Sequence, residues 1–447
     1  MTHRVHHAVS LFSNCGAGDL GYAKAGFRFD VMAELDPRRL YVCLLNHPHA
    51  VGVPGDLRTT WRTVVKKYRD RVGKARPGLL AACPPCQGMS SARSERGSES
   101  DPDAGMKDNR NLLVTVIAKV AKKLRPRIIV VENVQAFLTR QVRHPKSRRP
   151  ISAAKLLIEY LEADYEVYPM LVDLCHYGVP QNRKRTFLTF VARRQRCIKG
   201  MEHRNKIPYP MRTHGSGSAC EPITVEHALE EMDLPKLDAA TPEAASSTWG
   251  GGLHAVPAWS AERYAMVAAI SPGTGRSAWQ NDSCPRCDHV RVGPNDVTCP
   301  HCAAPLLRPV IAMANGRHRL ITGFRATTYS RMRPDQPAAT ITTASGNIGS
   351  NHTIHPFQNR LLSTLECALL QTLPRRFRWG DALNRWGHSN VRKMIGEAVP
   401  PLFTQAHGHV LRALLEGRFR VHMCGADERD CERAAKRAGI ATKRTSR

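Results

Sequence analysis

The 447-residue chain lacks the features that place a protein in a membrane or outside the cell. No apolar run approaches the roughly 20 residues that a membrane-spanning helix needs. The N-terminal stretch MTHRVHHAVSLFS is too polar for a signal peptide and leads directly into a strand-like pattern. Hydrophobic residues make up 42% of the chain, which predicts a globular protein rather than a disordered one. We therefore expect a cytoplasmic protein.

Acidic residues are scarce relative to basic ones. The chain has 38 Asp and Glu against 66 Lys and Arg, which gives a formal net charge of +28. Such an excess attracts a polyanion, and nucleic acid is the simplest polyanionic partner. Internal repeats are absent as well, so the length indicates about two or three ordinary domains.

The 14 cysteines are expected to be reduced in the cytoplasm, and therefore to be free thiols, metal ligands or catalytic groups. Two CPxC pairs stand out, Cys284 with Cys287 and Cys299 with Cys302, separated by 11 residues. Two such pairs at this spacing predict a tetrahedral zinc site. Its role is expected to be structural, because four thiolates leave no open position for water.

Residues 8–35 predict a strand, a tight loop, a helix and a second strand that ends at Glu34. This order is typical of a nucleoside-binding unit, in which the small residues of loop 14–18 let a ligand approach and the acid accepts ribose hydroxyls. The loop lacks the complete G-x-G-x-x-G pattern, which disfavours a dinucleotide. Asp56, after a later turn, suits either a helix cap or a contact with an adenine amino group.

The stretch 78–91, GLLAACPPCQGMSS, begins as a buried strand that two prolines stop. Cys86 and Gln87 then lie at the C-terminal edge of a sheet, where open α/β sheets bind their ligands. The Cys86 thiol is a candidate nucleophile, metal ligand or redox partner of Cys83, or has no role. Residues 90–109 have no periodicity, which is typical of a lid or a disordered insert, and their position after Cys86 favours a lid over the site.

Further polar groups follow other short strands. A second apolar strand ends at Glu132, and Gln181, Arg183 and Arg185 alternate on an extended segment, so that they share one face. A thiol at Cys86, a carboxyl and a guanidinium pair can surround a nucleobase. The sulfur would attack a ring carbon, the carboxyl would bind a ring nitrogen and an amine, and the guanidinium would bind a carbonyl.

At this point the sequence resembles the DNA (cytosine-5)-methyltransferase family. Several of the family's motifs occur in the family's order, and most of the chain is covered. They correspond here to the cofactor loop Phe12–Ala17, Pro85-Cys86-Gln87, Glu132-Asn133-Val134, the QxRxR residues 181–185, the helix 360–374 and the GNAVPP-like residues 396–401. The zinc insert, much of 194–340 and the last residues lie outside the resemblance.

The resemblance implies an α/β fold. A Rossmann-like, S-adenosylmethionine-dependent methyltransferase sheet is expected in residues 1–193 and is completed by 385–417. Scattered Gly, Pro, Ser and Thr in the region after Arg193 predict a second, smaller, β-rich domain. We expect this target-recognition domain to span 194–384, with the zinc-binding insert at 282–304. Residues 418–447 are expected to form a charged C-terminal tail.

The resemblance also implies a mechanism. Cys86 attacks C6 of a cytosine flipped out of the duplex, Glu132 binds N3 and the exocyclic amine, and Arg185 binds the O2 carbonyl. Arg183 completes the implied catalytic set, and C5 accepts the methyl group of S-adenosylmethionine. Contacts with the DNA substrate are implied for Gln87, Ser90, Asn133 and Gln181.

Cofactor contacts are implied for the first loop, the ends of the following strands and the C-terminal motif. The residues are Phe12, Ser13, Asn14, Cys15, Gly16, Glu34, Leu35, Asp56, Leu57, Pro85, Leu113, Glu397 and Ala398. Some residues depart from the family pattern. Asn14, Ala17 and Cys83 replace glycines, and Glu397 replaces an asparagine beside the cofactor. The Glu397 carboxylate would repel the cofactor's own carboxylate, so we expect it to point away.

The implied partner is double-stranded DNA, bound by a monomer from a prokaryote or a phage. The sequence leaves open whether a cognate restriction endonuclease exists. It also leaves open an RNA cytosine-5 methyltransferase on the same scaffold and a catalytically impaired, zinc-containing DNA-binding protein. A thiol redox protein that uses Cys83 and Cys86 would leave Glu132 and the arginine pair unexplained.

Overall fold

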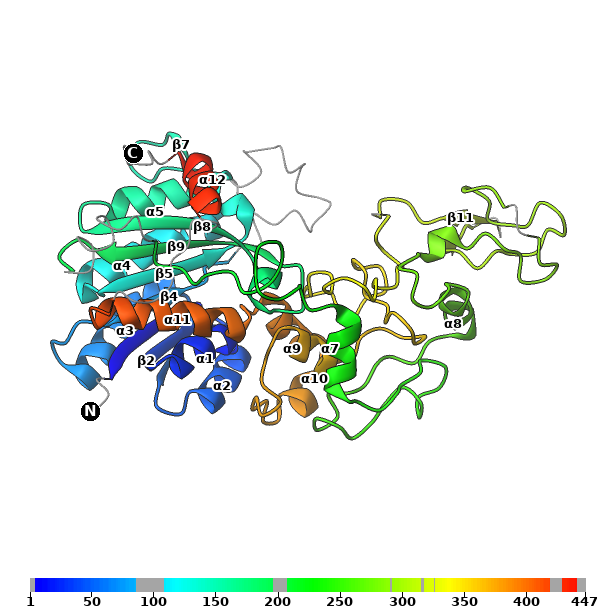
Figure 1. Ribbon diagram of the computed structural model, residues 1–447, viewed down its shortest axis with the longest axis horizontal. Helices are drawn as coiled ribbons and strands as arrows, with labels where there is room; N and C mark the ends of the chain where they lie inside the picture. Colours follow the sequence, from blue (N-terminus) through cyan, green and yellow to red (C-terminus); the bar gives the residue numbers. More distant parts are fainter. Residues whose placement is uncertain are drawn as a thin grey trace.

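The computed structural model describes residues 5–85, 108–195, 207–289, 292–314, 317–324, 326–418 and 428–439. Figure 1 shows a larger lobe, built around a sheet, and an elongated arm that extends away from it. The arm contains α8 (Ala261–Ala268) and β11 (His318–Leu320). The lid expected over residues 90–109 lies outside the described residues except for its last two. No helix in the described part of the chain has the length and apolar character of a membrane span.

The larger lobe contains a seven-stranded sheet in the order β3-β2-β1-β4-β5-β9-β8. Strands β1 to β5 are parallel to one another, and β9 is antiparallel to both of its neighbours. The strand order reverses between β1 and β4, which opens a crevice at the carboxyl ends of these strands. The predicted α/β class is therefore confirmed. The strands are β1 His6–Leu11, β2 Phe27–Glu34, β3 Val51–Pro54, β4 Leu79–Ala82, β5 Ile128–Asn133, β8 Tyr165–Asp173 and β9 Lys184–Ala192.

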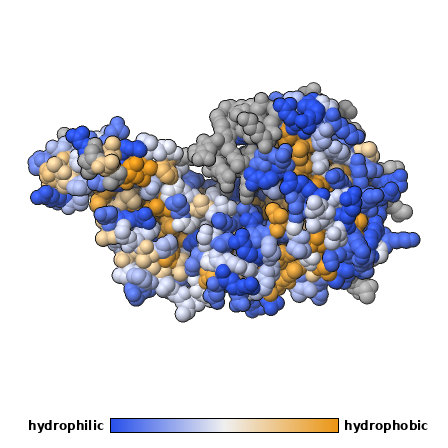
Figure 2. All heavy atoms as spheres, turned by 180° about the vertical axis from the view of Figure 1, so that it is seen from behind, coloured by the Kyte–Doolittle hydropathy of each residue, from blue (hydrophilic) through white to orange (hydrophobic). Residues whose placement is uncertain are grey.

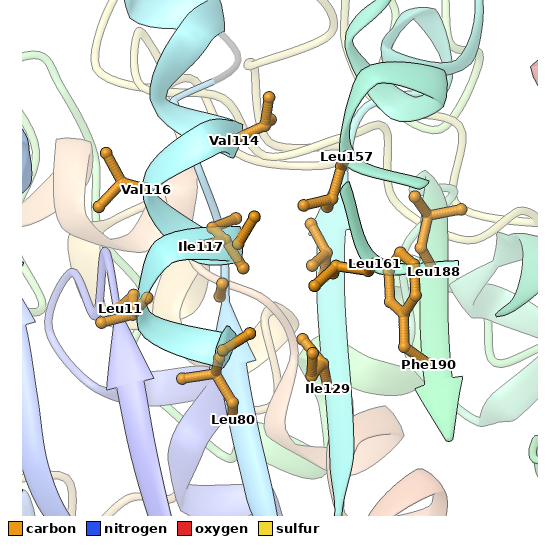
Figure 3. Close-up of a cluster of buried hydrophobic side chains, with 14 of the residues drawn as sticks. Leu11, Leu80, Val114, Val116, Ile117, Ile129, Leu157, Leu161, Leu188 and Phe190 are labelled. Atoms are coloured by element: carbon orange, nitrogen blue, oxygen red, sulfur yellow. The ribbon is translucent and has the colours of Figure 1, made fainter. Parts of the chain in front are cut away.

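Helices cover both faces of this sheet. One face carries α3 (Leu57–Val72), α4 (Val114–Leu124) and α5 (Ala153–Leu161). Figure 3 shows side chains of α4 and α5 meeting those of β1, β4, β5 and β9. The opposite face carries α1 (Ala17–Lys24), α2 (Pro37–Asn46) and α11 (Pro401–Leu415). Because β4 and β5 are covered on both sides, their sequences are continuous apolar runs rather than alternating ones.

Helix α11 brings the C-terminal part of the chain back to the sheet, where it packs beside α1. The contact depends on small residues, since a Cβ on Gly408 would lie 2.7 Å from Ala25. His407 of α11 is buried beneath it and shares a hydrogen bond of 3.1 Å with the Tyr22 hydroxyl. Burial lowers the pKa of His407 to about 3, so this imidazole is neutral at pH 7. The predicted division into domains stays a prediction.

Shorter elements connect the main ones. The 3₁₀ helices are η2 Asn109–Leu113, η3 Gln135–Leu138, η4 Leu174–Tyr177 and η5 Ala278–Gln280. Strands β6 (Gln141–Arg143) and β7 (Pro150–Ser152) form a hairpin. The C-terminal helix α12 (Glu428–Ala438) packs against β8.

The region after the sheet is poor in strands, and the prediction of a β-rich domain is wrong for its described residues. Its only strands there are β10 (Val310–Ala312) and β11 (His318–Leu320), of three residues each. Helices α7 (Val225–Met232), α9 (Thr364–Leu370) and α10 (Ala382–Glu397) share one core, and α8 (Ala261–Ala268) lies in the arm.

In this region, arginine side chains donate to backbone carbonyls that neighbouring strands would bind in a sheet. Buried Arg331 donates hydrogen bonds to the backbone carbonyls of Val267, Ile270, His355 and Gln358. A buried carbonyl needs a donor, but the donor need not be another strand. Loops held in this way carry the same scattered Gly, Pro, Ser and Thr that suggested short strands.

Helix α9 (Thr364–Leu370) lies within the predicted helix 360–374 but is shorter. Ser363 is the N-cap, and its hydroxyl and the Glu366 carboxylate form a reciprocal capping box. Arg360 adds a bidentate ion pair to Glu366 with two bonds of 2.7 Å, and both residues are at most 3% exposed. The Arg360 charge keeps the pKa of Glu366 at about 2, although burial alone would raise it.

We predict that Glu366→Ala lowers the free energy of unfolding by about 3–5 kcal/mol, because it leaves the Arg360 charge buried without its partner. The carboxylate's contribution is present above its ordinary pKa of 4.5 and is lost as the pH falls towards 2. Thermal unfolding as a function of pH measures both effects. Glu230→Ala, at an exposed position of α7, is the control. A Glu366→Ala midpoint equal to that of the control would refute the prediction.

Candidate active site

The loop between β1 and α1 lies against α2 and the C-terminal motif. Phe12, Asn14 and Gly16 have positive φ angles of 59°, 48° and 75°. A Cβ on Gly16 would lie 2.8 Å from the His47 ring, so this position requires glycine. Asn14 replaces a family glycine at a left-handed position that asparagine tolerates. Its Nδ2 donates to the Met394 carbonyl over 2.8 Å.

Two neighbours of Asn14 are directed inwards. The Ser13 hydroxyl donates to Ser10 Oγ at 3.0 Å. The Cys15 side chain is fully buried, and burial raises the pKa of its thiol to about 12. The Cys15 side chain therefore belongs to the core and contributes only its backbone to the loop.

Glu34 ends β2 with its carboxylate held in place. One oxygen accepts the backbone N–H of Asn14 at 2.8 Å, and the other accepts that of Asp36 at 3.1 Å. Burial raises the pKa of Glu34 above its ordinary value. Next to it, the Leu35 side chain is 66% exposed. A fixed carboxylate beside an exposed apolar side chain suits a nucleoside, whose sugar is polar and whose base is a flat apolar ring.

Asp56 is the N-cap of α3, which confirms the capping interpretation. Its Oδ1 accepts the backbone N–H of Arg58 at 2.8 Å, and the Arg58 guanidinium also binds it. These bonds lower the pKa of Asp56. Leu57, the first residue of α3, is buried below it.

Glu397 forms an ion pair with Arg39 of α2 in which both carboxylate oxygens take part; one of the two bonds measures 3.2 Å. The Arg39 guanidinium thus offsets the negative charge that distinguishes Glu397 from the family's asparagine. Sequence reasoning did not identify Arg39. It lies in the first turn of α2, where no motif in the sequence indicated a functional residue.

These groups share one cleft, with a volume of about 1650 Å³, between the larger lobe and the arm. Loop residues 322–324 and 340–351 supply much of the arm's side of it. Most of the predicted site residues line this cleft, whereas Cys15, Gly16 and Gln181 do not. Those that line it are Phe12, Ser13, Asn14, Glu34, Leu35, Asp56, Leu57, Pro85, Leu113, Glu132, Asn133, Arg183, Arg185, Glu397 and Ala398.

Glu132 and Arg185 meet at the edge of the sheet. The carboxyl end of β5 pairs with the start of antiparallel β9, and this register brings Arg185 Nε to 3.0 Å from Glu132 Oε1. The other carboxylate oxygen accepts a hydrogen bond from the Cys83 thiol at 2.7 Å. The sequence marked Cys83 only as a departure from glycine, and its contact with Glu132 required the structure.

Asn133 holds the chain that leads to the expected nucleophile. Its Nδ2 donates to the Pro84 carbonyl at 2.9 Å, and it is 2% exposed. Asn133 therefore shapes the turn after β4, and its predicted contact with DNA stays a prediction. Pro85 is the last described residue of this turn. The described residues do not include Cys86, Gln87 and Ser90.

Arg183 is a buried link between segments. It is 1% exposed and donates to the carbonyls of Ile341, Gly396 and Ala398 at 2.9–3.0 Å. These bonds join the entry to β9 with the arm's side of the cleft and the C-terminal motif. The geometry supports a positioning role for Arg183 rather than the catalytic role expected from the resemblance.

Gln181 is also buried, with no exposed surface. Its side chain accepts the backbone N–H of Ile341 at 2.9 Å and donates to Gln371 at 3.1 Å. Strand β9 begins only at Lys184, so the expected common face does not extend from Gln181 to Arg185. A direct contact between Gln181 and DNA is therefore not supported.

The four cysteines of the CPxC pairs come together in the arm. Their sulfur atoms all lie within 4.8 Å of one another. Cys284 and Cys302 are 3.5 Å apart and Cys287 and Cys299 are 3.7 Å apart, sulfur to sulfur. Thiolates bound tetrahedrally at 2.3 Å would be separated by about 3.8 Å. The cluster therefore has the dimensions of a zinc site.

The sheet order and the nucleoside-type pocket beside it define a methyltransferase of the Rossmann-like class. The family model of the C-5 cytosine-specific DNA methylases matches residues 7–248 and 273–412. The chain belongs to this family, and it is a DNA cytosine-5 methyltransferase.

Curated relatives and solved structures agree with this assignment. Type II methyltransferase M1.HgaI of Avibacterium volantium is 26% identical over 89% of this chain and 95% of its own length. Type II methyltransferase M.DdeI of Desulfomicrobium norvegicum is 24% identical over 89% of this chain and 86% of its own length. The crystal structure of Spodoptera frugiperda DNMT2, at 13% identity and a TM-score of 0.51, covers 92% of this chain and 99% of its own. The structural likeness supports the fold alone.

We predict opposite effects from the two arginines. Arg183→Ala leaves three buried carbonyls without their donor and lowers the free energy of unfolding by about 3 kcal/mol or more. Arg185→Ala lowers stability less, because the Glu132 carboxylate that it leaves lines the cleft and keeps its hydrogen bond from Cys83. It lowers kcat by about 100-fold, as expected for the loss of a group that binds the reacting base. Thermal unfolding and methyl-transfer kinetics separate the two effects. Equal losses of stability in both variants would contradict the assignment.

Proposed function

We propose that this enzyme methylates C5 of a cytosine that has left a specific duplex DNA sequence and entered the cleft between lobe and arm. The observation that carries the proposal is the Glu132–Arg185 pair at the junction of β5 and β9, in the same cleft as the nucleoside-type pocket. The two groups supply a carboxyl and a guanidinium in fixed relation, and cytosine offers complementary donors and acceptors along one edge.

Glu132 binds N3 and the exocyclic amine of the cytosine and thereby favours the flow of electrons into the ring. Arg185 orients Glu132 through Nε, and its remaining N–H groups bind the O2 carbonyl. The Cys83 thiol, on the other oxygen of Glu132, fixes the plane of the carboxylate. The base is thus held in one orientation before any bond forms.

Cys86 follows the turn that Asn133 holds, and we assign it the role of nucleophile. Its thiolate forms a bond to C6, and the electron pair moves towards C5, which accepts a methyl group. Loss of the C5 proton and cleavage of the sulfur–C6 bond restore the aromatic ring and the free thiolate. A free cysteine is mostly protonated at pH 7, so a cation beside the thiol would favour the thiolate.

The pocket beside β1 and β2 fits S-adenosylmethionine. The fixed Glu34 carboxylate can accept ribose hydroxyls, and exposed Leu35 can pack on the adenine. Asn14 Oδ1 is buried without a hydrogen-bond partner and is available to a donor on the ligand. When bound, the cofactor supplies an electrophilic methyl group. The Arg39–Glu397 pair forms one wall of this pocket and keeps the Glu397 charge from repelling the cofactor's carboxylate.

Zinc is the metal that we assign to the four cysteines of the arm. Backbone N–H groups two residues after Cys284 and after Cys299 approach those sulfurs at 3.4 Å, which stabilises thiolates. The metal would hold together a part of the arm whose own buried core is small.

The proposed partners follow from the relatives and the charge. The named relatives are Type II methyltransferases, which supports a bacterial restriction–modification role with a cognate endonuclease. We further propose a cytoplasmic monomer that binds duplex DNA, with a net charge of +28 contributing to affinity.

Bisulfite sequencing of DNA from cells that express the protein tests the activity and identifies the methylated sequence. We predict that Cys86→Ala abolishes methylation and leaves DNA binding largely intact, because only the covalent step is lost. Cys220→Ala, at an exposed cysteine outside the cluster, is the control and should remain active. Methylation by Cys86→Ala at the wild-type level would overturn the mechanism.

We predict that the purified protein holds one zinc ion per chain and that Cys299→Ser loses it. The arm then unfolds at a lower temperature or becomes sensitive to protease, because metal binding and folding are coupled. Native mass spectrometry and limited proteolysis measure these effects. Cys220→Ser should keep the metal. A metal-free wild-type protein with the same protease resistance as Cys299→Ser would exclude a structural zinc.

A further inference from the structure

The arm brings one large apolar side chain to the cleft. Phe324 follows β11 and lines the same cleft as Glu132 and Arg185, and 48% of its surface is exposed. Figure 2 shows a mostly hydrophilic surface on the larger lobe, whereas apolar residues gather on the arm. The cleft wall around Phe324 is otherwise built largely of threonine, serine, glycine and asparagine.

The position of Phe324 is supported from behind by other aromatic rings. Its ring lies 6.0 Å from that of Tyr329, at an interplanar angle of 74°, and Tyr329 lies 5.4 Å from Trp279 at 84°. The Trp279 Nε1 donates to the Thr328 carbonyl at 3.0 Å, which anchors this row. Gly349 leaves room for the ring, since a Cβ there would lie 3.0 Å from Phe324 Cε1. The ring is therefore a braced side chain at the edge of the cleft.

The strand before Phe324 is basic. His318 and Arg319 of β11 are both exposed, and no acidic residue occurs between them and Phe324. Basic side chains of this kind bind DNA phosphates and set the position of a protein on the duplex, without reading the sequence. An aromatic ring that follows such a strand would be brought close to the base pairs when the strand contacts the backbone.

We propose that Phe324 is the wedge that enters the base stack at the target site and fills the space that the flipped cytosine leaves. This inference rests on the proposed function, because a wedge is needed only if the cytosine leaves the duplex. Flipping breaks stacking and pairing interactions, and an inserted apolar ring restores part of the stacking. The cytosine leaves towards Glu132 and Arg185 on the larger lobe, and the ring enters from the arm.

The test uses Phe324→Ala in the full-length enzyme, with Phe357→Ala as the matched control. Phe357 is also in the arm and 42% exposed, but it does not line the cleft. The DNA is a duplex with the target sequence found by bisulfite sequencing. On this duplex, Phe324→Ala should lower the single-turnover methylation rate by about 5- to 100-fold, the range expected for the loss of one aromatic–base stack. Phe357→Ala should not change it.

A second duplex carries the same target cytosine as a single-nucleotide bulge. When this unpaired cytosine turns out, the flanking base pairs stack on each other and leave no space to fill, so the cost that Phe324 offsets is absent. Here Phe324→Ala should methylate within about twofold of wild type. In the paired duplex, 2-aminopurine at the target position should show a smaller fluorescence increase with Phe324→Ala than with wild type.

The outcomes separate the wedge from other roles. Equal losses on both duplexes would mean that Phe324 contacts the flipped base or supports the arm, and they would overturn the proposal. Wild-type rates of Phe324→Ala on the paired duplex would overturn it as well. If wild-type enzyme methylated neither duplex nor cellular DNA, the proposed function itself would fail. Methylation by wild type with no effect of Phe324 would reject the wedge alone.

Discussion

The cleft depends on the pairing of β5 with antiparallel β9. Parallel strands alone would bring together residues that follow carboxyl ends, such as Glu34 and Glu132. Because β9 runs in the opposite direction, its first residues reach the same edge of the sheet and bring Arg185 to the Glu132 carboxylate. The proposed base-binding pair therefore arises from strand direction, and neither residue needs a long loop to reach the other.

The other walls of the cleft are attached to this sheet by side chains that bind backbone. Arg183 donates to the carbonyls of Ile341 and of Gly396 in the C-terminal motif, and Asn14 donates to the carbonyl of Met394 in α10. Such bonds cost stability when broken, because each leaves a buried carbonyl unpaired. These bonds therefore connect the cofactor pocket directly to the arm's side of the cleft.

The arm follows a different physical principle. It has few strands, and its loops are held by buried arginines, by a cysteine cluster and by a row of aromatic rings. These interactions stabilise irregular backbone without a sheet. The same composition suggested a β-rich domain, because Gly, Pro, Ser and Thr are common both between strands and in loops of this kind.

Local chemistry was sufficient to predict much of this protein from its sequence. The βαβ unit, the cap at Asp56, the two CPxC pairs and the individual motifs depend on residues close in the chain, whose spacing determines their geometry. Only the tertiary structure decided which polar groups meet. Asn14 and Met394, Arg39 and Glu397, or Cys83 and Glu132 are far apart in sequence, and the burial of Arg183 and Gln181 follows from what packs around them. Such contacts have no local pattern, because the fold as a whole determines them.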